Sequence, residues 1–527
     1  MRRIALLSAA VTLAVASVCA PAQEPRLPDI GSSAGELITP AQQQEYGAML
    51  LAQLRHYDYL LEDPLLDSWL DTLGSRLSAS SAQPRQPFTF FMLRQRQINA
   101  FATLGGHIGV NAGLVLAADR EDEVAAVMSH EIAHVTQEHV LRGAERAQRD
   151  QLPILLAMLG AIVVAQSAGG SSSNEASQAA IMSAMGLMQQ RQIDYTRSNE
   201  SEADRLGIQT LSRSHYDPAA MAGFFNKMLT RSRSNAANWY GETPDYLRSH
   251  PVTTTRISEA KERAEQLGRT PGGFLGVDAV SDNPLLPSGL QVSGKALLGG
   301  GTGQFDYARE RLRVLSADTP ALAIREYQRF ESAGKLSDAQ RYGLALARLQ
   351  ANQAGAAASG FAPLLEQHPG DLWLTLALAE AEARSGKAAA ADARFESLLR
   401  QTPNNRPVAL TYARVLAERN TPAAGKRAQA ILRPLMGASA QDAVFQKVFA
   451  RASEIAGDPI RAGEAYAEAA YLSGRPEQAL VQLNTLKKRA EVDYYARARI
   501  EARIAAITPT VLELKRQGIR DEDLRRR

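Results

Sequence analysis

The chain has 527 residues, of which 45% are hydrophobic and 22% are charged. This length is too great for one hydrophobic core, so two or three domains are expected, and the composition excludes a fibrous or wholly disordered chain. Loss of Arg2 and Arg3 with an N-terminal signal would reduce 59 basic residues to 57 against 56 acidic ones. Such a near-neutral balance indicates no nucleic-acid partner.

Residues 1–22 have the features of a secretory signal peptide. Two arginines precede an apolar run from Ile4 to Val18, and small residues follow, so cleavage is expected near Ala22. The single cysteine, Cys19, lies inside this segment, so the mature chain is expected to have no disulfide. These features are typical of a bacterial envelope protein and predict a periplasmic location. A lipoprotein anchor at Cys19 is disfavoured because Val18 precedes it.

The first folded domain is expected over residues 39–267. Residues 23–38 are rich in Pro, Ser and Gly and predict a flexible leader. Thr39-Pro40 and Asp63-Pro64 then each predict a helix cap followed by a first turn. Two helices therefore open the domain.

A small sheet is expected next. Residues 88–93 (FTFFML) and 98–115 (INAFATLGGHIGVNAGLV) are apolar runs that predict strands, with a tight turn at Gly105-Gly106. A long helix should then begin near Asp119 and continue to Gln148. The predicted class is therefore an α-rich α+β fold.

The long helix contains the motif HEIAH. His130 and His134 are four residues apart, so they lie about 40° apart on nearly one helix face and can bind one zinc ion. Glu131 lies beside them and can reach a water on the metal, whose pKa zinc lowers from 15.7 to about 7. This spacing predicts metal-assisted peptide hydrolysis, although a lone match also arises by chance.

A third ligand must come from elsewhere in the chain. His139 is five residues past His134, about 140° around a continuous helix, and is expected to point away from the metal as a surface residue or a residue behind the ligands. On a later helix, Glu200 and Asp204 share a face. Glu200 would complete three protein ligands, and Asp204 could accept a histidine N–H; Glu202 lies on a different face.

Residues 152–165 (LPILLAMLGAIVVA) form the most apolar stretch after the signal. The stretch is shorter than the roughly 20 residues of a spanning helix. It is consistent either with a buried helix or with a hairpin that makes peripheral membrane contact, and a short apolar run favours the buried helix.

The C-terminal half repeats itself. Residues 268–304 are rich in Gly, Pro and Ser and predict a linker. Beyond it, FAPLLEQHP from Phe361 aligns with FESLLRQTP from Phe395 at an offset of 34, the period of tetratricopeptide repeats. An all-α solenoid of such repeats is expected over residues 305–505, with a tail over 506–527. Stacked repeats present a concave binding surface.

HEIAH, ESEAD and SHPVTTTRI, after NAFATLGGHIGVNAGLV, resemble the M48 family of zinc metallopeptidases. With the signal peptide and repeats, the chain is similar to the periplasmic branch of that family that enhances β-barrel assembly. The resemblance implies a gluzincin fold holding one zinc ion through His130, His134 and Glu200, with Glu131 as general base. It also implies that Asp204 supports the site or donates a proton. His107 departs from the pattern and is expected to line the substrate cleft.

The resemblance also implies that His250 faces the zinc. Two roles stay open for it: stabilising the oxyanion of the tetrahedral intermediate, or acting as a fourth ligand that keeps the enzyme latent. The function implied is quality control and assembly of outer-membrane β-barrel proteins. Unfolded or stalled precursors would be the substrates, and the assembly machinery would be a partner of the repeats. The alternative is a chaperone or scaffold whose metal site is inactive.

Overall fold

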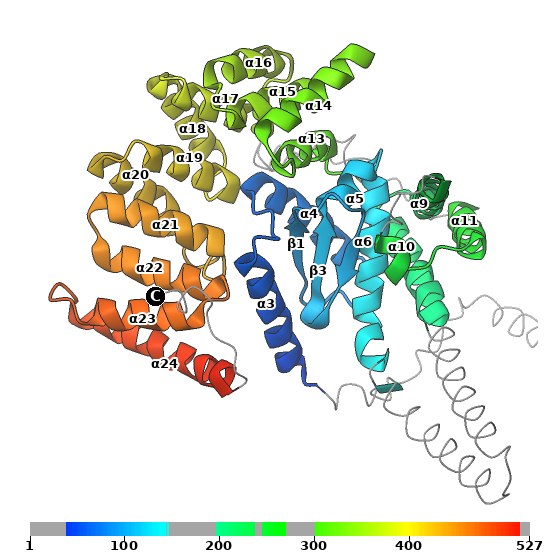
Figure 1. Cartoon of the computed structure of the whole chain (residues 1–527), viewed down its shortest axis with the longest axis horizontal. Helices are drawn as coiled ribbons and strands as arrows, with labels where there is room; N and C mark the ends of the chain where they lie inside the picture. The colour runs from blue at the N-terminus through cyan, green and yellow to red at the C-terminus, as the bar shows by residue number, and fades with distance from the viewer. Residues whose placement is uncertain (1–37, 144, 147–195, 238–244, 270–300, 517–527) are drawn as a thin grey trace, which may run out of the picture.

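The computed structural model describes residues 38–143, 145–146, 196–237, 245–269 and 301–516. An α-rich unit with a small sheet comes first, and an arc of paired helices lies beside it (Figure 1). The expected signal peptide, nearly all of the leader and the apolar stretch 152–165 lie outside the described residues. None of the described helices combines the length and the hydropathy that a membrane span requires.

The two opening helices are confirmed. Helix α3 (Pro40–His56) begins with a capping box, in which Thr39 and Gln42 satisfy each other's backbone N–H groups. Helix α4 (Pro64–Ala79) begins at Asp63, whose carboxylate accepts hydrogen bonds from two backbone N–H groups of the first turn. Both caps follow directly from the local sequence.

The small sheet is also confirmed. It contains β1 (Thr89–Leu93), β2 (Ala100–Ala102) and β3 (His107–Asn111) in the order β1-β3-β2. Strand β3 pairs with β1 in parallel and with β2 in antiparallel fashion. The turn between β2 and β3 contains the short 3-10 helix η1 (Leu104–Gly106), where Gly105 and Gly106 have φ of 69° and 73°, values that glycine adopts readily.

The expectation that strand structure continues to residue 115 is wrong. The last pair of the ladder joins Leu93 to Asn111, and β1 supplies no further partner beyond it. The chain instead enters helix α5 (Ala112–Ala117). An apolar run of this length fits either a strand or a buried helix. Because β1 ends at Leu93, residues after Asn111 have no partner strand there, and the chain forms a helix.

Helix α6 (Glu121–Thr136) carries the HEIAH motif and differs from its predicted bounds at both ends. Arg120, not Asp119, is the N-cap residue; Asp119 contacts Lys227 at 2.6 Å instead. The helix ends at Thr136, well before Gln148, because Glu138 adopts a left-handed φ of 52° that a continuous helix excludes. Helical structure resumes at residue 139.

After the helical segment that starts at residue 139, the described residues of the first unit contain four more helices. They are the helix over residues 196–213, α9 (Ala219–Ala237), α10 (Asp245–Ser249) and α11 (Thr254–Arg269). Helix α9 packs against both α6 and α11. Helix α11 runs two residues past the boundary expected at residue 267.

The second unit consists of helices that pack mainly against their chain neighbours. They are α13 (Phe305–Leu315), α14 (Pro320–Ala333), α15 (Asp338–Gln350), α16 (Ala354–Gln367), α17 (Leu372–Arg384), α18 (Ala388–Gln401), α19 (Arg406–Glu418), α20 (Pro422–Leu432), the 3-10 helix η3 (Arg433–Leu435), α21 (Ala443–Ala456), α22 (Pro459–Leu472), α23 (Pro476–Lys487) and α24 (Tyr494–Arg516). This arrangement is an α-rich solenoid, as predicted.

The period of 34 residues is present in the helix positions. Helices α15, α17 and α19 begin at Asp338, Leu372 and Arg406, each 34 residues after the one before. Phe361 and Phe395, which occupy equivalent positions in α16 and α18, are both fully buried. The repeat in the sequence is therefore a repeat of packing.

The two units share one hydrophobic core. Helix α13 packs against α4 and α5 of the first unit, and its Phe305 ring lies 6.4 Å from the ring of Trp69. Arg311 of α13 forms a buried bidentate pair with Asp63, with N–O distances of 2.6 and 2.7 Å. The solenoid was expected to start at residue 305, and helix α13 does begin there. This helix, however, packs against the first unit and so joins the two units.

The tail expected from residue 506 is wrong in its first part. Helix α24 continues to Arg516, and Ile507 and Val511 are buried within the last hydrophobic cluster of the solenoid. Pro509 lies inside this helix. The pattern of buried apolar residues therefore outweighs the proline as an indicator of where the helix ends.

Candidate metal centre

Helix α6 places three functional side chains in the interior of the first unit. His130 and Glu131 are 0% and 1% exposed, and His134 lies one turn further along the same helix. The ring nitrogens Nε2 of His130 and His134 are 3.0 Å apart. The sequence spacing thus produces the shared face that it predicted.

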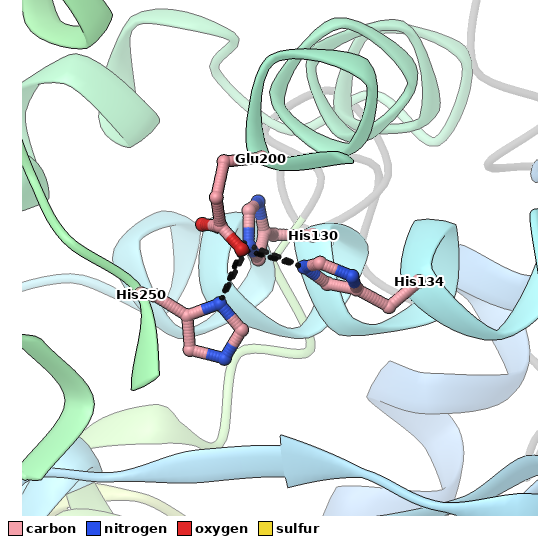
Figure 2. Close-up of side chains that lie close together, drawn as sticks. All are labelled: His130, His134, Glu200 and His250. Atoms are coloured by element: carbon pink, nitrogen blue, oxygen red, sulfur yellow. Dashed lines mark hydrogen bonds and ion pairs between the residues drawn. The ribbon is translucent and has the colours of Figure 1, made fainter. Parts of the chain in front are cut away.

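Glu200 reaches the same point from the helix over residues 196–213. Its carboxylate oxygens lie 3.4 Å from Nε2 of His130 and 3.4 Å from Nε2 of His134. Figure 2 shows the imidazole rings converging around this carboxylate. The two helices approach closely at Gly207, where a Cβ atom would lie only 3.2 Å from the backbone nitrogen of His130.

His250 is the fourth member of the cluster. It follows the short helix α10, and its Nδ1 lies 3.0 Å from Glu200 and 3.3 Å from Nε2 of His130. The ring of Tyr246, one turn earlier, stacks on the His250 ring at 4.9 Å and is fully buried. Tyr246 was not recognised in the sequence, where it appears only as an aromatic residue of a short loop.

These four side chains fit a metal ion. One donor atom from each of His130, His134, Glu200 and His250 lies within 4.8 Å of all the others. Nε2 of His130 lies 3.0 Å from Nε2 of His134 and 3.3 Å from Nδ1 of His250, near the spacing of about 3.3 Å between two ligand atoms of a tetrahedral ion with bonds of 2.0–2.1 Å. Three imidazoles and one carboxylate are ligands typical of zinc.

The protonation of two of these groups suits metal binding. Burial lowers the pKa of His134 to about 3, so its imidazole is neutral and has a free lone pair. Burial opposes ionisation of Glu200, but contacts with the three histidines hold its pKa well below the usual range. The carboxylate is therefore ionised at any physiological pH.

Glu131 lies beside the cluster. Helix α6 packs against the edge strand β2, and Oε1 of Glu131 lies 3.5 Å from Nε2 of His250. Burial raises the pKa of Glu131, although the nearby histidines lower it in part. A buried carboxylate with a raised pKa is a suitable proton acceptor near neutral pH.

Asp204 lies behind His130, on the side away from the metal ligands. Its Oδ1 is 2.9 Å from Nδ1 of His130, the position from which a carboxylate fixes the tautomer of a ligand histidine. Arg256 of α11 binds Asp204 in bidentate geometry at 2.7 and 2.8 Å and contacts Glu200 at 2.8 Å. Despite the burial of Asp204, these contacts keep its pKa below the usual value.

Arg256 is a site residue that sequence reasoning missed. It is only 7% exposed and lies over the ring of Phe225 at 4.8 Å. The sequence shows it as a charged residue near the start of a helix, a position where arginine is usually solvated. Its place in SHPVTTTRI, six residues after His250, is the one indication that could have identified it.

His139 does not point away from the ligands. Because the helix breaks at Glu138, His139 turns back, so that its Nδ1 lies 2.8 Å from Nδ1 of His134 and its Nε2 lies 3.0 Å from Glu202. The expectation that His139 points away from the ligands assumed a continuous helix and is therefore wrong. Of the two alternatives, a surface residue or a residue behind the ligands, the structure shows the second. Glu202 faces away from the cluster, as its helix position predicts.

His107 does not line a cleft at the site. It is 4% exposed, its Nδ1 lies 3.2 Å from the carbonyl oxygen of Leu104, and it fills the space left by Gly47 of α3. The residue packs the sheet against a helix, so this expectation is wrong. The sequence position of His107, at the start of a strand, is compatible with either a cleft residue or a core residue, so the sequence could not distinguish them.

Residues 64–264 match the model of peptidase family M48. The beta-barrel assembly-enhancing protease of Yersinia pestis is 32% identical over 484 residues, which are 92% of this chain and 92% of the relative. The Escherichia coli K12 protein of the same name is 32% identical over 370 residues, 70% of this chain and 69% of the relative. A Vibrio cholerae relative is 42% identical over 258 residues, so the match spans 48% of this chain and 51% of that protein. Together with the HEIAH helix and the cluster of four donor side chains, this similarity over nearly the whole length identifies the chain as a metalloprotease that belongs to peptidase family M48.

Proposed function

We propose that this protein is a zinc-dependent endopeptidase of the periplasm that acts in the quality control and assembly of outer-membrane β-barrel proteins. The observation that carries the proposal is the convergence of His130, His134, Glu200 and His250, with the buried Glu131 beside them. The names of the relatives from Yersinia pestis and Escherichia coli support the cellular role. The apparent signal peptide at residues 1–22 supports export.

His130, His134 and Glu200 would hold the zinc ion. When bound, zinc supplies a Lewis acid that polarises the peptide carbonyl and lowers the pKa of water. Glu131 takes the proton of the attacking water and passes it to the leaving amine. Asp204 holds the proton on Nδ1 of His130, so that Nε2 is free to act as a ligand.

His250 serves as a latch in this proposal. Its Nδ1 reaches within hydrogen-bond range of both His130 and Glu200, which is where a fourth ligand would lie. While it stays there, the position needed by water is blocked. Binding of a client would displace the loop after α10 and open the site. The other role, stabilisation of the oxyanion, requires His250 during turnover and not before it.

The His250→Ala variant separates these two roles. A latch predicts equal or higher peptidase activity, with faster cleavage of folded bystander proteins. An oxyanion role predicts a loss of kcat. The zinc content of the variant should stay near one per chain, because three ligands remain; loss of the metal would contradict both roles.

The solenoid would recruit clients or the β-barrel assembly machinery. A cavity of about 910 Å³ lies between its concave side and the first unit, lined by side chains that include Arg94, Arg384, Arg414 and Glu418. None of the clustered metal donors lines this cavity, so we assign it to recognition and not to chemistry. Unfolded or stalled β-barrel precursors would be the substrates.

A second candidate function is a repeat-based chaperone with a closed metal site. The contact of His250 with Glu200 at 3.0 Å favours it, because a permanently occupied fourth position would prevent hydrolysis. The intact Glu131 favours the enzyme, since a scaffold has no use for a buried base.

The experiment that tests the proposal uses the purified mature protein. Its metal content is measured, together with cleavage of casein and of an unfolded β-barrel protein, before and after treatment with a chelator. About one zinc per chain and chelator-sensitive cleavage are expected. Metal-free protein, or cleavage that survives the chelator, would contradict the endopeptidase; binding of the β-barrel protein without cleavage would favour the chaperone.

A further inference from the structure

A second histidine lies directly behind the ligand His134. His139 is 5% exposed, and its ring meets the ring of His134 edge-on at 4.8 Å between centroids. The two Nδ1 atoms are 2.8 Å apart, and the far nitrogen of His139 lies 3.0 Å from Glu202. Three polar side chains therefore form one line that leads from the metal ligands toward the surface.

The backbone is shaped to produce this arrangement. Helix α6 ends at Thr136, and Glu138 takes a φ of 52°, which residues other than glycine seldom adopt. The next helical segment starts at residue 139. Without this reversal, His139 would lie about 140° away from His134 around the helix and could not reach it.

The direction of the hydrogen bonds follows from ligation. If His134 binds a metal through Nε2, the atom that faces His130 and Glu200, its Nδ1 must carry the proton and donate. Nδ1 of His139 must then accept, which leaves the His139 proton on Nε2, where Glu202 accepts it. One tautomer of His139 satisfies both contacts, and it is the tautomer that metal binding at His134 requires.

The two ligand histidines are thus supported from one helix by different means. Asp204 contacts His130 directly at 2.9 Å, while Glu202, two residues earlier, reaches His134 only through His139. Glu200, on the same helix, is itself one of the proposed metal ligands. The helix over residues 196–213 therefore presents three carboxylates, one to the metal cluster and one behind each of the two histidines.

We propose that His139 and Glu202 are positioning residues that fix the ring orientation and tautomer of His134 and so raise its affinity for the metal. This inference rests on the metal site of the proposed function. Neither residue touches the substrate. Contacts of this kind typically change metal affinity by about 10–100-fold.

The test measures zinc affinity of the full mature chain by competition with a chromophoric chelator. His139→Phe keeps the ring but removes both hydrogen bonds, and should weaken zinc binding by about 10–100-fold. His139→Asn places an amide oxygen where Nδ1 stood, so it should recover most of the lost affinity. His368→Phe, which removes the contact of a half-exposed histidine with Asp338 in the solenoid, is the matched control and should leave affinity unchanged.

A spectroscopic readout accompanies the affinities. In the cobalt-substituted protein, the ring N–H protons of ligand histidines give paramagnetically shifted NMR signals. The signal of His134 should persist in the parent and in His139→Asn, where the proton is hydrogen-bonded, and should exchange rapidly with water in His139→Phe. A change of packing alone would not produce this pattern.

Parental zinc affinity in His139→Phe would overturn the inference, as would equal affinities of the Asn and Phe variants. If the Phe variant fails to fold, Glu202→Ala replaces it, because the Glu202 side chain is 30% exposed and its loss is tolerable; a several-fold weakening is expected, and no weakening overturns the inference. A parent chain that binds no zinc would instead refute the proposed function.

Discussion

The metal centre and the solenoid place their charged groups in opposite ways. At the centre, Glu131, Asp204 and Arg256 are each at most 7% exposed and are linked through shared partners. In the solenoid, ion pairs such as Arg384–Glu418 recur between successive repeats, and their side chains are 31% and 48% exposed. The first arrangement is a single buried network, whereas pairs between repeats such as Arg384–Glu418 are separate surface contacts.

This difference determines how each region responds to change. In a buried network, removal of one charge leaves its partner unpaired in a medium of low dielectric, and the cost is large. In a solenoid, each repeat contacts its neighbours only, and surface pairs are screened by water and salt. Substitutions should therefore have severe effects at the centre and small, local effects along the repeats.

The largest effect is expected at Glu131. The Glu131→Gln variant keeps the shape of the side chain but removes the proton acceptor, so kcat should fall by at least about 10²–10⁴-fold. Zinc content should match that of the parent, because Glu131 is not among the four clustered donors. Peptidase assays with metal analysis check this, and cleavage at the parental rate would show that another group accepts the proton.

The next test separates two carboxylates on one helix. Glu200→Ala should yield protein without zinc, because the variant loses the donor that faces both His130 and His134. Glu202→Ala should still purify with zinc, although its affinity is reduced, because Glu202 reaches the cluster only through His139. Metal analysis of the two proteins decides, and the reverse result would move the ligand to Glu202.

Arg256 tests the buried network itself. Arg256→Met removes the charge that pairs with Asp204 and Glu200 while keeping much of the volume, so the free energy of unfolding should fall by about 3–5 kcal/mol. Urea unfolding of the zinc-loaded protein measures this. A loss below about 1 kcal/mol would mean that the metal and His130 compensate the two carboxylates without the arginine.

The smallest effect is expected in the solenoid. Arg384→Ala removes a partly exposed pair with Glu418 and should change the free energy of unfolding by about 0–1 kcal/mol, with zinc content unchanged. Urea unfolding at two salt concentrations checks it. A loss as large as that of Arg256→Met would contradict the contrast between the two regions.

The sequence by itself determined the features that depend on neighbours along the chain. The HEIAH spacing places His130 and His134 on one face, Thr39 and Asp63 cap their helices, and the 34-residue period gives the solenoid. The shared face of Glu200 and Asp204 was predicted in the same way. Each of these depends on helix geometry within a few turns, which short-range hydrogen bonds and steric limits fix.

The tertiary structure alone decided the contacts between segments far apart in the chain. The reversal at Glu138 turns His139 toward His134 and Glu202, Arg256 joins Asp204 across 52 positions, and Arg311 pairs with Asp63 across 248. Local pattern treats Arg256 and Arg311 as ordinary surface residues, because a charged side chain is solvated by default. Only burial against a distant partner makes their charge matter, and burial is a property of the folded chain.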